Sequence, residues 1–374
     1  MGIPFNKPYL TGKETHYIYE AVSSGKISGN GMFTKKCQQF FEERYGFRKT
    51  LLTTSCTDAL EMAALLLGIQ AGDEVIMPSY TFVSTSNAFV LRGAKIVFAD
   101  SYSNNPNIDP VQIEKLITNK TKAIVVVHYA GIACDMEAVM ALSKKHNIYV
   151  VEDAAQAIDS YHQGQPLGSI GHLAAFSFHE TKNIIAGEGG LLAINDERFV
   201  ERAEIIWEKG TNRAAFFRGE VDKYGWVDVG SSFLPSEVVA AFLYAQLENL
   251  EAIQAQRKHI WEYYNRAFQA ITDKVQLPTL PNYATNNGHL YYLVCNDLDT
   301  RTALIQHLRA QNIHAVFHYL SLHKSPYYQD KYDGQALPNC DHFSNCLVRL
   351  PLFFELTDAQ LEKISQAVLD FFGE

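Results

Sequence analysis

The sequence has 374 residues, of which 47% are apolar and 20% are charged. This length and balance predict a globular protein with one large domain and a smaller one. The formal net charge of −9 argues against a nucleic-acid partner, because a nucleic-acid-binding face is basic. The first residues lack the apolar stretch of a secretory signal, and no run of about 18 apolar residues occurs. We therefore expect a cytoplasmic protein without a membrane span.

The cysteines and histidines do not indicate a disulfide scaffold or a metal site. The six cysteines form no C-x-x-C pair, and we interpret them as reduced thiols. The 13 histidines include no H-E-x-x-H motif. His314 and His318 are four residues apart in a β-like run, where that spacing separates them along one face. A metal-dependent hydrolase is therefore not indicated.

Short β-rich runs alternate with helical patterns between about residue 50 and residue 200. The clearest helices cover residues 57–68 and 136–147. The expected strands cover residues 74–77, 95–99, 123–128, 148–152, 174–178 and 191–194. Strands that are apolar throughout and alternate with helices predict a mostly parallel sheet covered on both faces. The expected architecture is therefore α/β.

The chain after residue 235 shows a different order of elements. Residues 236–269 have the pattern of one long helical region. Apolar runs and helices then alternate up to a C-terminal helix, which a capping box of Thr357 and Gln360 would open. We expect a large domain over residues 1–250, including the N-terminal segment, and a smaller α+β domain over residues 251–374.

Lys182 lies between a β-rich run and a glycine-rich turn, in the stretch AFSFHETKNIIAGEGG. A lysine just after a strand can project into a cleft above the sheet. Its amine can form an imine (a Schiff base) with an aldehyde cofactor such as pyridoxal phosphate (PLP). Most lysines are instead solvated surface residues, but the flanking Ser177, His179 and GEGG turn favour a cofactor lysine. Burial and nearby cations would lower its pKa, which the neutral amine requires.

Asp153 ends a buried strand in VVEDAAQAIDS, where side chains point into the ligand crevice of an open α/β sheet. In a PLP enzyme, such a carboxylate pairs with the pyridine nitrogen and keeps it protonated. The competing interpretation is an N-cap of a helix over the following AAQAI, a position that Asp fills well. Glu152 would point the opposite way, and Gln156 lies within reach of the ring hydroxyl.

Two further features suit the same pocket. The turn at residues 53–57, TTSCT, opens a helix, and the free N–H groups and dipole of that helix end can bind a phosphate. Plain N-capping by Ser55 or Thr57 is the alternative. Phe82 follows a strand that ends at the same sheet edge, where it could stack on the pyridine ring or simply belong to the core.

Taken together, these motifs resemble the DegT-type nucleotide-sugar aminotransferases, which are PLP-dependent enzymes of fold type I. The resemblance covers nearly the whole chain and is carried by TSCTDAL, PSYTFVSTSNAF, VVEDAAQAID, SFHETKN with GEGG, and the late RLPLF. It implies a large domain with a mostly parallel mixed sheet between helices, plus a smaller C-terminal α+β domain. It also implies a homodimer with shared active sites that moves an amino group from L-glutamate to a nucleotide-linked keto-sugar.

The resemblance also implies a role for each matching residue. Lys182 would form the Schiff base and move protons, Asp153 would pair with the pyridine nitrogen, and Gln156 would touch the ring hydroxyl. The remaining contacts would come from Ser177, Cys56 and Thr57 at the phosphate and from Phe82 on the ring face. Relatives with histidine in place of the lysine deoxygenate sugars, and Lys182 excludes that activity.

Two stretches depart from the pattern of the family. Many members have Asn-Tyr-Arg-Met where this chain has Ser232-Phe233-Leu234-Pro235, and their Asn reaches the phosphate across the dimer. Ser232 could donate in its place. The common Pro-Leu-His near the sugar pocket is replaced by Ser321-Leu322-His323.

The resemblance further points to members that act on C4 of TDP-4-keto-6-deoxyglucose, through HYAGIAC, RAEIIWEKGTNR and AVFHYLSLH. The galactose-configured product is favoured, with the glucose-configured product as the alternative. Tyr319 and His323 are candidate sugar contacts. Candidate cations for the diphosphate are Lys209, Arg213, Arg218 and Lys26.

Two other functions compete with this hypothesis. The cofactor residues alone would equally suit a PLP enzyme that acts on an amino acid, such as a desulfurase or an aldolase. A non-catalytic sensor with the same fold is the other possibility, but such proteins often lose the lysine that this chain retains at Lys182.

Overall fold

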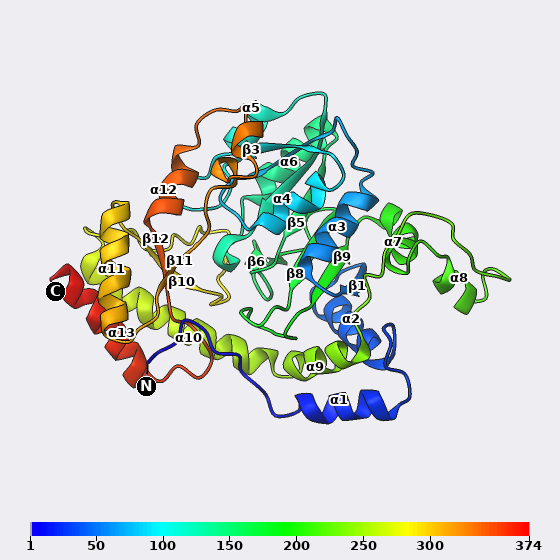
Figure 1. Cartoon of the computed structure of the whole chain (residues 1–374), viewed down its shortest axis with the longest axis horizontal. Helices are drawn as coiled ribbons and strands as arrows, with labels where there is room; N and C mark the ends of the chain where they lie inside the picture. Colours follow the sequence, from blue (N-terminus) through cyan, green and yellow to red (C-terminus); the bar gives the residue numbers. More distant parts are fainter. Residues whose placement is uncertain (1, 374) are drawn as a thin grey trace.

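The computed structural model describes residues 2–373 and contains a seven-stranded sheet flanked by helices (Figure 1). Strands β8, β5, β4, β2 and β3 are parallel in this spatial order. β9 pairs antiparallel with β8, and β1 pairs antiparallel with β9 at the edge of the sheet. The bounds are β1 Lys49–Thr53, β2 Glu74–Pro78, β3 Lys95–Ala99, β4 Thr121–Val127, β5 Tyr149–Asp153, β8 Leu173–Ser177 and β9 Gly190–Ile194. The predicted mostly parallel α/β sheet is confirmed, and β1 adds a strand that the pattern did not predict.

Helices cover both faces of the sheet, as predicted. Val125 and Val151 pack in a core with α3, α4 and α7, whereas their neighbours Ile124 and Val150 pack with α5 and α6. This alternation follows from the period of two in a strand. The bounds of these helices are α3 Cys56–Leu66, α4 Val83–Val90, α5 Pro110–Leu116, α6 Met136–His146 and α7 Val200–Trp207.

The expected single helical region over residues 236–269 is two helices. α9 (Glu237–Leu247) and α10 (Leu250–Ala267) are separated at Glu248 and Asn249, where the backbone of Asn249 leaves the helical region. α9 lies beneath the large sheet, and α10 leads toward the C-terminal part (Figure 1). Within residues 2–373, no helix combines the length and apolarity that a bilayer crossing requires.

The C-terminal part is built on a three-stranded antiparallel sheet in the order β10, β12, β11. Helices α10, α11 and α13 share its apolar core. The predicted capping box at the start of α13 is confirmed, because Thr357 and Gln360 each bond the backbone of the other. The bounds are β10 Tyr291–Val294, α11 Leu298–Ala310, β11 Val316–Phe317, α12 Pro338–Cys346, β12 Leu347–Leu350 and α13 Asp358–Phe372. The boundary near residue 250 remains our proposal.

The N-terminal segment does not belong entirely to the large domain, which corrects the expectation from the sequence. The Ile3 N–H donates to the Asn312 carbonyl at 2.8 Å, and the His314 N–H donates to the Ile3 carbonyl at 3.0 Å. Ile3 is buried in the core of the small sheet. The chain then crosses to α1 (Glu14–Ser23), which lies along α9 (Figure 1). The remaining bounds are α2 Met32–Tyr45, β6 Tyr161–His162, β7 Gln165–Pro166 and α8 Arg213–Phe217.

A buried carboxylate on α9 caps the start of α2. Glu237 accepts hydrogen bonds from the N–H groups of Gly31, Phe33 and Thr34 at 2.9, 2.7 and 3.1 Å, and from the Thr34 hydroxyl. The first N–H groups of a helix have no partner inside the helix, so this side chain replaces the missing acceptors. The contact joins α2, which covers the sheet, to α9.

We expect Glu237→Gln to lower the free energy of unfolding by about 2 kcal/mol. The amide keeps one acceptor oxygen, and its NH2 group would face N–H groups at the start of α2 that also donate. The measurement is chemical unfolding followed by circular dichroism. Glu362→Gln, on the exposed side of α13, is the matched control. Equal stability of the two variants would contradict the assigned capping role.

Candidate active site

A cavity of about 850 Å³ lies between the carboxyl ends of the parallel strands and the small sheet. Such a crevice is where open α/β sheets bind their ligands. It is lined by the predicted site residues Cys56, Thr57, Phe82, Asp153, Gln156, Ser177, Lys182 and Tyr319. Lining residues that the sequence analysis missed include Phe5, Asn6, His289, His318 and Arg349.

Lys182 lies in a loop that the backbone holds as a hairpin between β8 and β9. The Phe178 N–H donates to Gly189 at 2.8 Å, the Glu180 N–H donates to Gly187 at 2.9 Å, and the Lys182 N–H donates to His179 at 2.9 Å. Its Nζ has no hydrogen-bond partner among residues 2–373 and lines the cavity, so it is not a solvated surface lysine. Burial lowers the pKa of this ammonium, and the charge of Arg349 lowers it further, as predicted.

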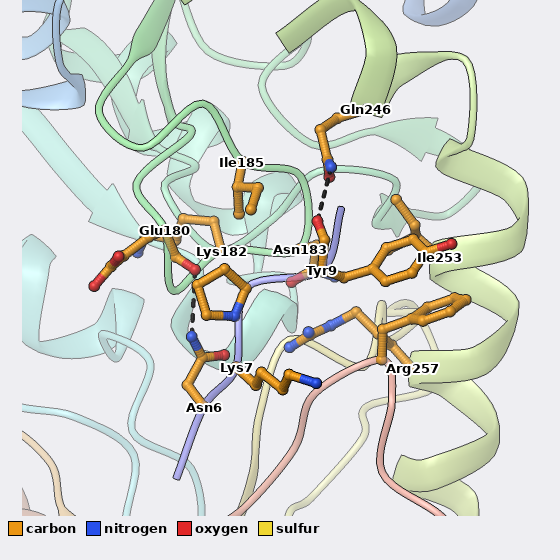
Figure 2. A pocket seen from close by; sticks show the side chains of 12 residues that line it. Asn6, Lys7, Tyr9, Glu180, Lys182, Asn183, Ile185, Gln246, Ile253 and Arg257 are labelled. Carbon is orange, nitrogen blue, oxygen red and sulfur yellow. Dashed lines mark hydrogen bonds between the residues drawn. The ribbon is translucent and has the colours of Figure 1, made fainter. Parts of the chain in front are cut away.

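The N-terminal segment braces this loop from the other side (Figure 2). The Asn6 amide donates to the Glu180 carbonyl at 3.3 Å, and the Gln246 amide donates to the Tyr9 carbonyl at 2.9 Å. The pocket there has a volume of only about 10 Å³, about the room of one water molecule. Residues far apart in the sequence therefore fix the backbone that presents Lys182.

Asp153 ends β5 and is buried. One carboxylate oxygen accepts from the Thr85 hydroxyl at 2.7 Å and the other accepts from the Ala155 N–H at 3.2 Å. Among residues 2–373, it has no cation within ion-pair distance. Burial raises its pKa, whereas the bonds from Thr85 and Ala155 and the charge of Lys182 oppose that rise. The N-cap interpretation is wrong, because no helix follows.

The neighbours of Asp153 take the places that the strand pattern predicts. Glu152 points to the other face, where its carboxylate lies 2.9 Å from His128 Nε2 and accepts three backbone N–H groups. Gln156 faces the cavity. Its oxygen accepts from the Ala130 N–H at 2.6 Å, and its amide donates to the Tyr319 hydroxyl at 3.0 Å.

The start of α3 forms one end of the cavity. The Ser55 hydroxyl caps the helix by accepting from the Asp58 N–H at 3.1 Å, so the N-cap interpretation holds for Ser55. The N–H groups of Cys56 and Thr57, at the first two helical positions, have no acceptor within the helix. Both residues line the cavity, so capping and anion binding coexist at this helix end.

Gly190 lets β9 pass directly against this turn. A Cβ at Gly190 would lie 2.3 Å from the Ser55 carbonyl carbon and 2.4 Å from the Cys56 nitrogen. Gly190 also pairs with Ser177 across β8 and β9, which brings the Ser177 side chain to the same end of the cavity.

We expect Gly190→Ala to weaken PLP binding about tenfold or more, because the added methyl group displaces the N–H groups of the turn. The measurement is titration of the cofactor-free protein with PLP, followed by absorbance. Gly189→Ala is the matched control, since its Cβ would meet nothing closer than 3.4 Å. An unchanged PLP affinity in Gly190→Ala would show that the turn does not hold the cofactor.

Phe82 is the N-cap residue of α4, and the residue is 55% exposed. The core interpretation is therefore wrong. The ring centroid lies 6.2 Å from that of Tyr319 across the cavity. His179 Nδ1 lies 3.0 Å from the Thr181 hydroxyl, a hydrogen bond within the lysine loop.

The other predicted contacts do not line this cavity. Ser232, Lys209 and Arg213 are exposed residues of the segment around α8, the stretch between α7 and α9. α8 itself projects from the molecule (Figure 1). His323 is buried outside the cavity, with Nδ1 2.8 Å from the Ser79 hydroxyl and Nε2 3.6 Å from Asp341, so it does not line the cavity in which the sugar contact was expected. The candidate cations Arg218 and Lys26 also lie elsewhere, paired with Glu204, Glu220 and the Asn30 carbonyl.

Comparisons with known proteins agree with this geometry. The chain matches the model of the DegT/DnrJ/EryC1/StrS aminotransferase family over residues 8–369. It is 33% identical to the spore coat polysaccharide biosynthesis protein SpsC of Bacillus subtilis, over 98% of this chain and 96% of that protein. The aminotransferase TlmJ from Streptoalloteichus hindustanus has a TM-score of 0.92 at 27% identity, covering 100% of this chain and 99% of that chain. The PLP form of Spr1654 from Streptococcus pneumoniae has a TM-score of 0.91 at 26% identity, covering 99% and 98%.

The fold and the site define a PLP-dependent aminotransferase of fold type I. Within that class, the chain belongs to the DegT/DnrJ/EryC1/StrS aminotransferase family, whose members include sugar aminotransferases, and its cofactor is pyridoxal phosphate.

Proposed function

We propose that this chain moves an amino group from L-glutamate to the C4 ketone of TDP-4-keto-6-deoxyglucose and forms TDP-4-amino-4,6-dideoxygalactose. The observation that carries the proposal is one cavity lined by both Lys182 and the buried Asp153. Among residues 2–373, the Lys182 amine has no hydrogen-bond partner and the Asp153 carboxylate has no cation at ion-pair distance. The choice of sugar is supported by the resemblance of the sequence to the transaminase of enterobacterial common antigen synthesis. The polysaccharide biosynthesis named for SpsC is consistent with an amino-sugar product.

The residues around the cavity fit PLP. The N–H groups of Cys56 and Thr57, together with Ser177, would hold the phosphate, and Phe82 would cover one face of the ring. When bound, PLP supplies an electron-withdrawing ring that stabilises negative charge on the carbon bearing the substrate amine.

The proton transfers fall to Lys182 and Asp153. Lys182 Nζ would hold the cofactor through its aldehyde, and as a free amine it would accept the proton that leaves the substrate carbon and hand it on. Its lowered pKa favours the neutral amine that accepts this proton. The Asp153 carboxylate would hold a proton on the ring nitrogen of PLP, and the positive charge there would keep the carboxylate ionised. The Gln156 amide keeps one N–H free, beyond its bond to Tyr319, for the ring hydroxyl.

We extend the proposal to a homodimer with shared active sites. The segment around α8 carries Ser232, Lys209 and Arg213 away from their own cavity, so these residues would serve the cavity of the partner. This segment exposes large apolar side chains, among them Phe217 at 70% and Trp226 at 85%. Such a patch is typical of a surface that is covered by another protein.

The test is an absorbance spectrum of the purified protein before and after addition of L-glutamate. A visible band that shifts toward the near-ultraviolet would establish the first half-reaction. TDP-4-keto-6-deoxyglucose is then added, and the product is identified by mass spectrometry and by NMR of the new stereocentre. A glucose-configured product would correct the stereochemistry alone.

Two outcomes would favour the competing functions. A band that responds to amino acids, without amino-sugar from any keto-sugar nucleotide, would indicate a PLP enzyme acting on amino acids. Absence of a band after addition of PLP would contradict the role of Lys182 and favour a non-catalytic protein.

A further inference from the structure

The segment of residues 318–323 carries Tyr319 into the cavity in a rare backbone conformation. The φ angle of Tyr319 is +47°, in the left-handed region that residues other than glycine seldom adopt. Such a conformation persists only where the surrounding structure holds it. The contacts of this segment therefore decide whether the Tyr319 ring keeps its place, with its centroid 6.2 Å from that of the Phe82 ring.

The small domain holds this segment through one side chain of α12. The Ser344 hydroxyl donates to the Tyr319 carbonyl at 3.3 Å and accepts from the Ser321 N–H at 3.2 Å. These two bonds shape the turn. Because they lie within the C-terminal part, they do not fix the turn relative to the large domain.

The large domain holds both ends of the same segment through the loop that follows β2. At one end, the Tyr80 hydroxyl donates to the His318 carbonyl at 2.5 Å. At the other end, the Leu322 N–H donates to the Ser79 carbonyl at 2.9 Å. The loop that makes these bonds leads directly to Phe82, which borders the cavity.

His323 adds a side-chain bond to Ser79. The His323 N–H donates to Ser79 Oγ at 3.2 Å, and His323 Nδ1 lies 2.8 Å from the same oxygen. Ser79 is fully buried, and its hydroxyl proton has no other acceptor among residues 2–373, so the hydroxyl donates to Nδ1. Nε2 then carries the ring proton, 3.6 Å from Asp341. The three side chains look like a hydrolase triad, but a buried hydroxyl cannot reach a substrate.

We propose that His323 is a positioning residue for the substrate pocket. Through Ser79, it fixes the loop that carries Phe82 against the segment that carries Tyr319, and it so sets the gap between the two rings. The inference rests on the proposed function, because the keto-sugar is the substrate whose fit in this gap is expected to change. His323 itself touches neither substrate nor cofactor, since it does not line the cavity.

The test compares His323→Leu, which removes the bond to Ser79, with His323→Asn. The amide oxygen of asparagine can take the place of Nδ1 and accept from the Ser79 hydroxyl, so this variant is the conservative rescue. His172→Leu is the matched control. It removes a similar bond, from the Val150 N–H to Nδ1 at 3.0 Å, just before β8 at the opposite end of the sheet from the cavity.

Two measurements are made on each variant. The first is the Michaelis constant and kcat for the keto-sugar nucleotide with PLP bound. The second is hydrogen exchange of a peptide that covers residues 316–323, followed by mass spectrometry on the protein without cofactor. This second measurement reads the N–H groups of Leu322 and His323 directly and does not depend on activity.

We expect His323→Leu to raise the Michaelis constant about tenfold and to change kcat less than about threefold, because Lys182 and Asp153 are untouched. Exchange of the peptide should become about tenfold faster. His323→Asn should restore most of both values, and His172→Leu should leave both unchanged. Ser79→Ala removes the same bond from the other side and replaces His323→Leu if that variant fails to fold.

Faster exchange with an unchanged Michaelis constant would overturn the inference, because His323 would then serve the fold alone. Equal losses in His323→Leu and His323→Asn would also overturn it, since the bond to Ser79 would not be the cause. Absence of amino-sugar formation by wild type would contradict the proposed function instead. In that case, hydrogen exchange in the variants would still decide whether His323 holds the segment.

Discussion

Replacement of Lys182 by alanine should lower turnover by about 10⁴-fold or more. The variant loses both the amine that holds the cofactor aldehyde and the base that moves the proton, and general acid–base catalysis alone typically contributes 10²–10⁴. The folded state should be preserved, because the Nζ atom makes no hydrogen bond within residues 2–373 and the loop is held by its backbone. The measurement is amino-sugar formation, followed by chromatography.

Lys182→Arg is the control for charge and bulk. It keeps a cation in the cavity, but a guanidinium stays protonated at neutral pH and cannot accept the proton. We expect it to be as inactive as the alanine variant. Added methylamine should restore part of the turnover of Lys182→Ala by supplying a neutral amine to the vacated space. Near-native turnover in either variant would refute the assignment of Lys182.

Asp153→Asn should lower turnover about 10²- to 10³-fold, because a neutral amide cannot hold a proton on the ring nitrogen as a carboxylate does. The shape of the site should survive. The amide oxygen can still accept from Ala155, and the amide nitrogen can donate to Thr85 if that hydroxyl turns toward Thr81, 2.9 Å away. The measurement is kcat in the overall reaction.

The same substitution should stabilise the protein without cofactor. Burial raises the pKa of Asp153 in the folded state above its ordinary value of 3.8, so folding with an ionised carboxylate costs free energy at neutral pH. This cost grows as the pH rises through the folded-state pKa and vanishes below the unfolded value. Chemical unfolding should therefore show a larger advantage of Asp153→Asn at pH 8 than at pH 5. A less stable and fully active variant would contradict both roles.

If Asp153→Asn lowers turnover but raises stability, the carboxylate of Asp153 serves the reaction and not the fold. A carboxylate that serves only the fold gains stability from its partners, as Glu237 does through four hydrogen bonds to α2. Within residues 2–373, Asp153 has two hydrogen bonds and no cation at ion-pair distance. It is buried at a cost that a protonated ring would offset.

The sequence alone determined the class of the fold and the part of the site that the large domain forms. Apolar runs alternating with helices led to the parallel sheet, because a strand buried on both faces needs apolar residues at every position. The same logic placed Asp153 and Lys182 at one sheet edge, since the carboxyl ends of parallel strands meet there. The start of α3 was visible as a cap sequence, because helix ends have unpaired N–H groups that local residues must satisfy.

Tertiary structure decided which residues of the N-terminal segment and of the C-terminal part reach the site. Arg349 and Phe5 are 344 positions apart by residue number, and no local pattern indicates that one stacks on the other. His323 looked like a sugar contact from its place in the chain, but long-range packing against Ser79 buried it elsewhere. The Asp153 carboxylate was expected either to cap a helix or to face the cofactor, and only the absence of a helix after β5 decided between them. The periodicity of apolar residues indicates which face of a helix or strand is buried. It does not indicate which residues of two domains contact each other, because those contacts join segments far apart in the sequence.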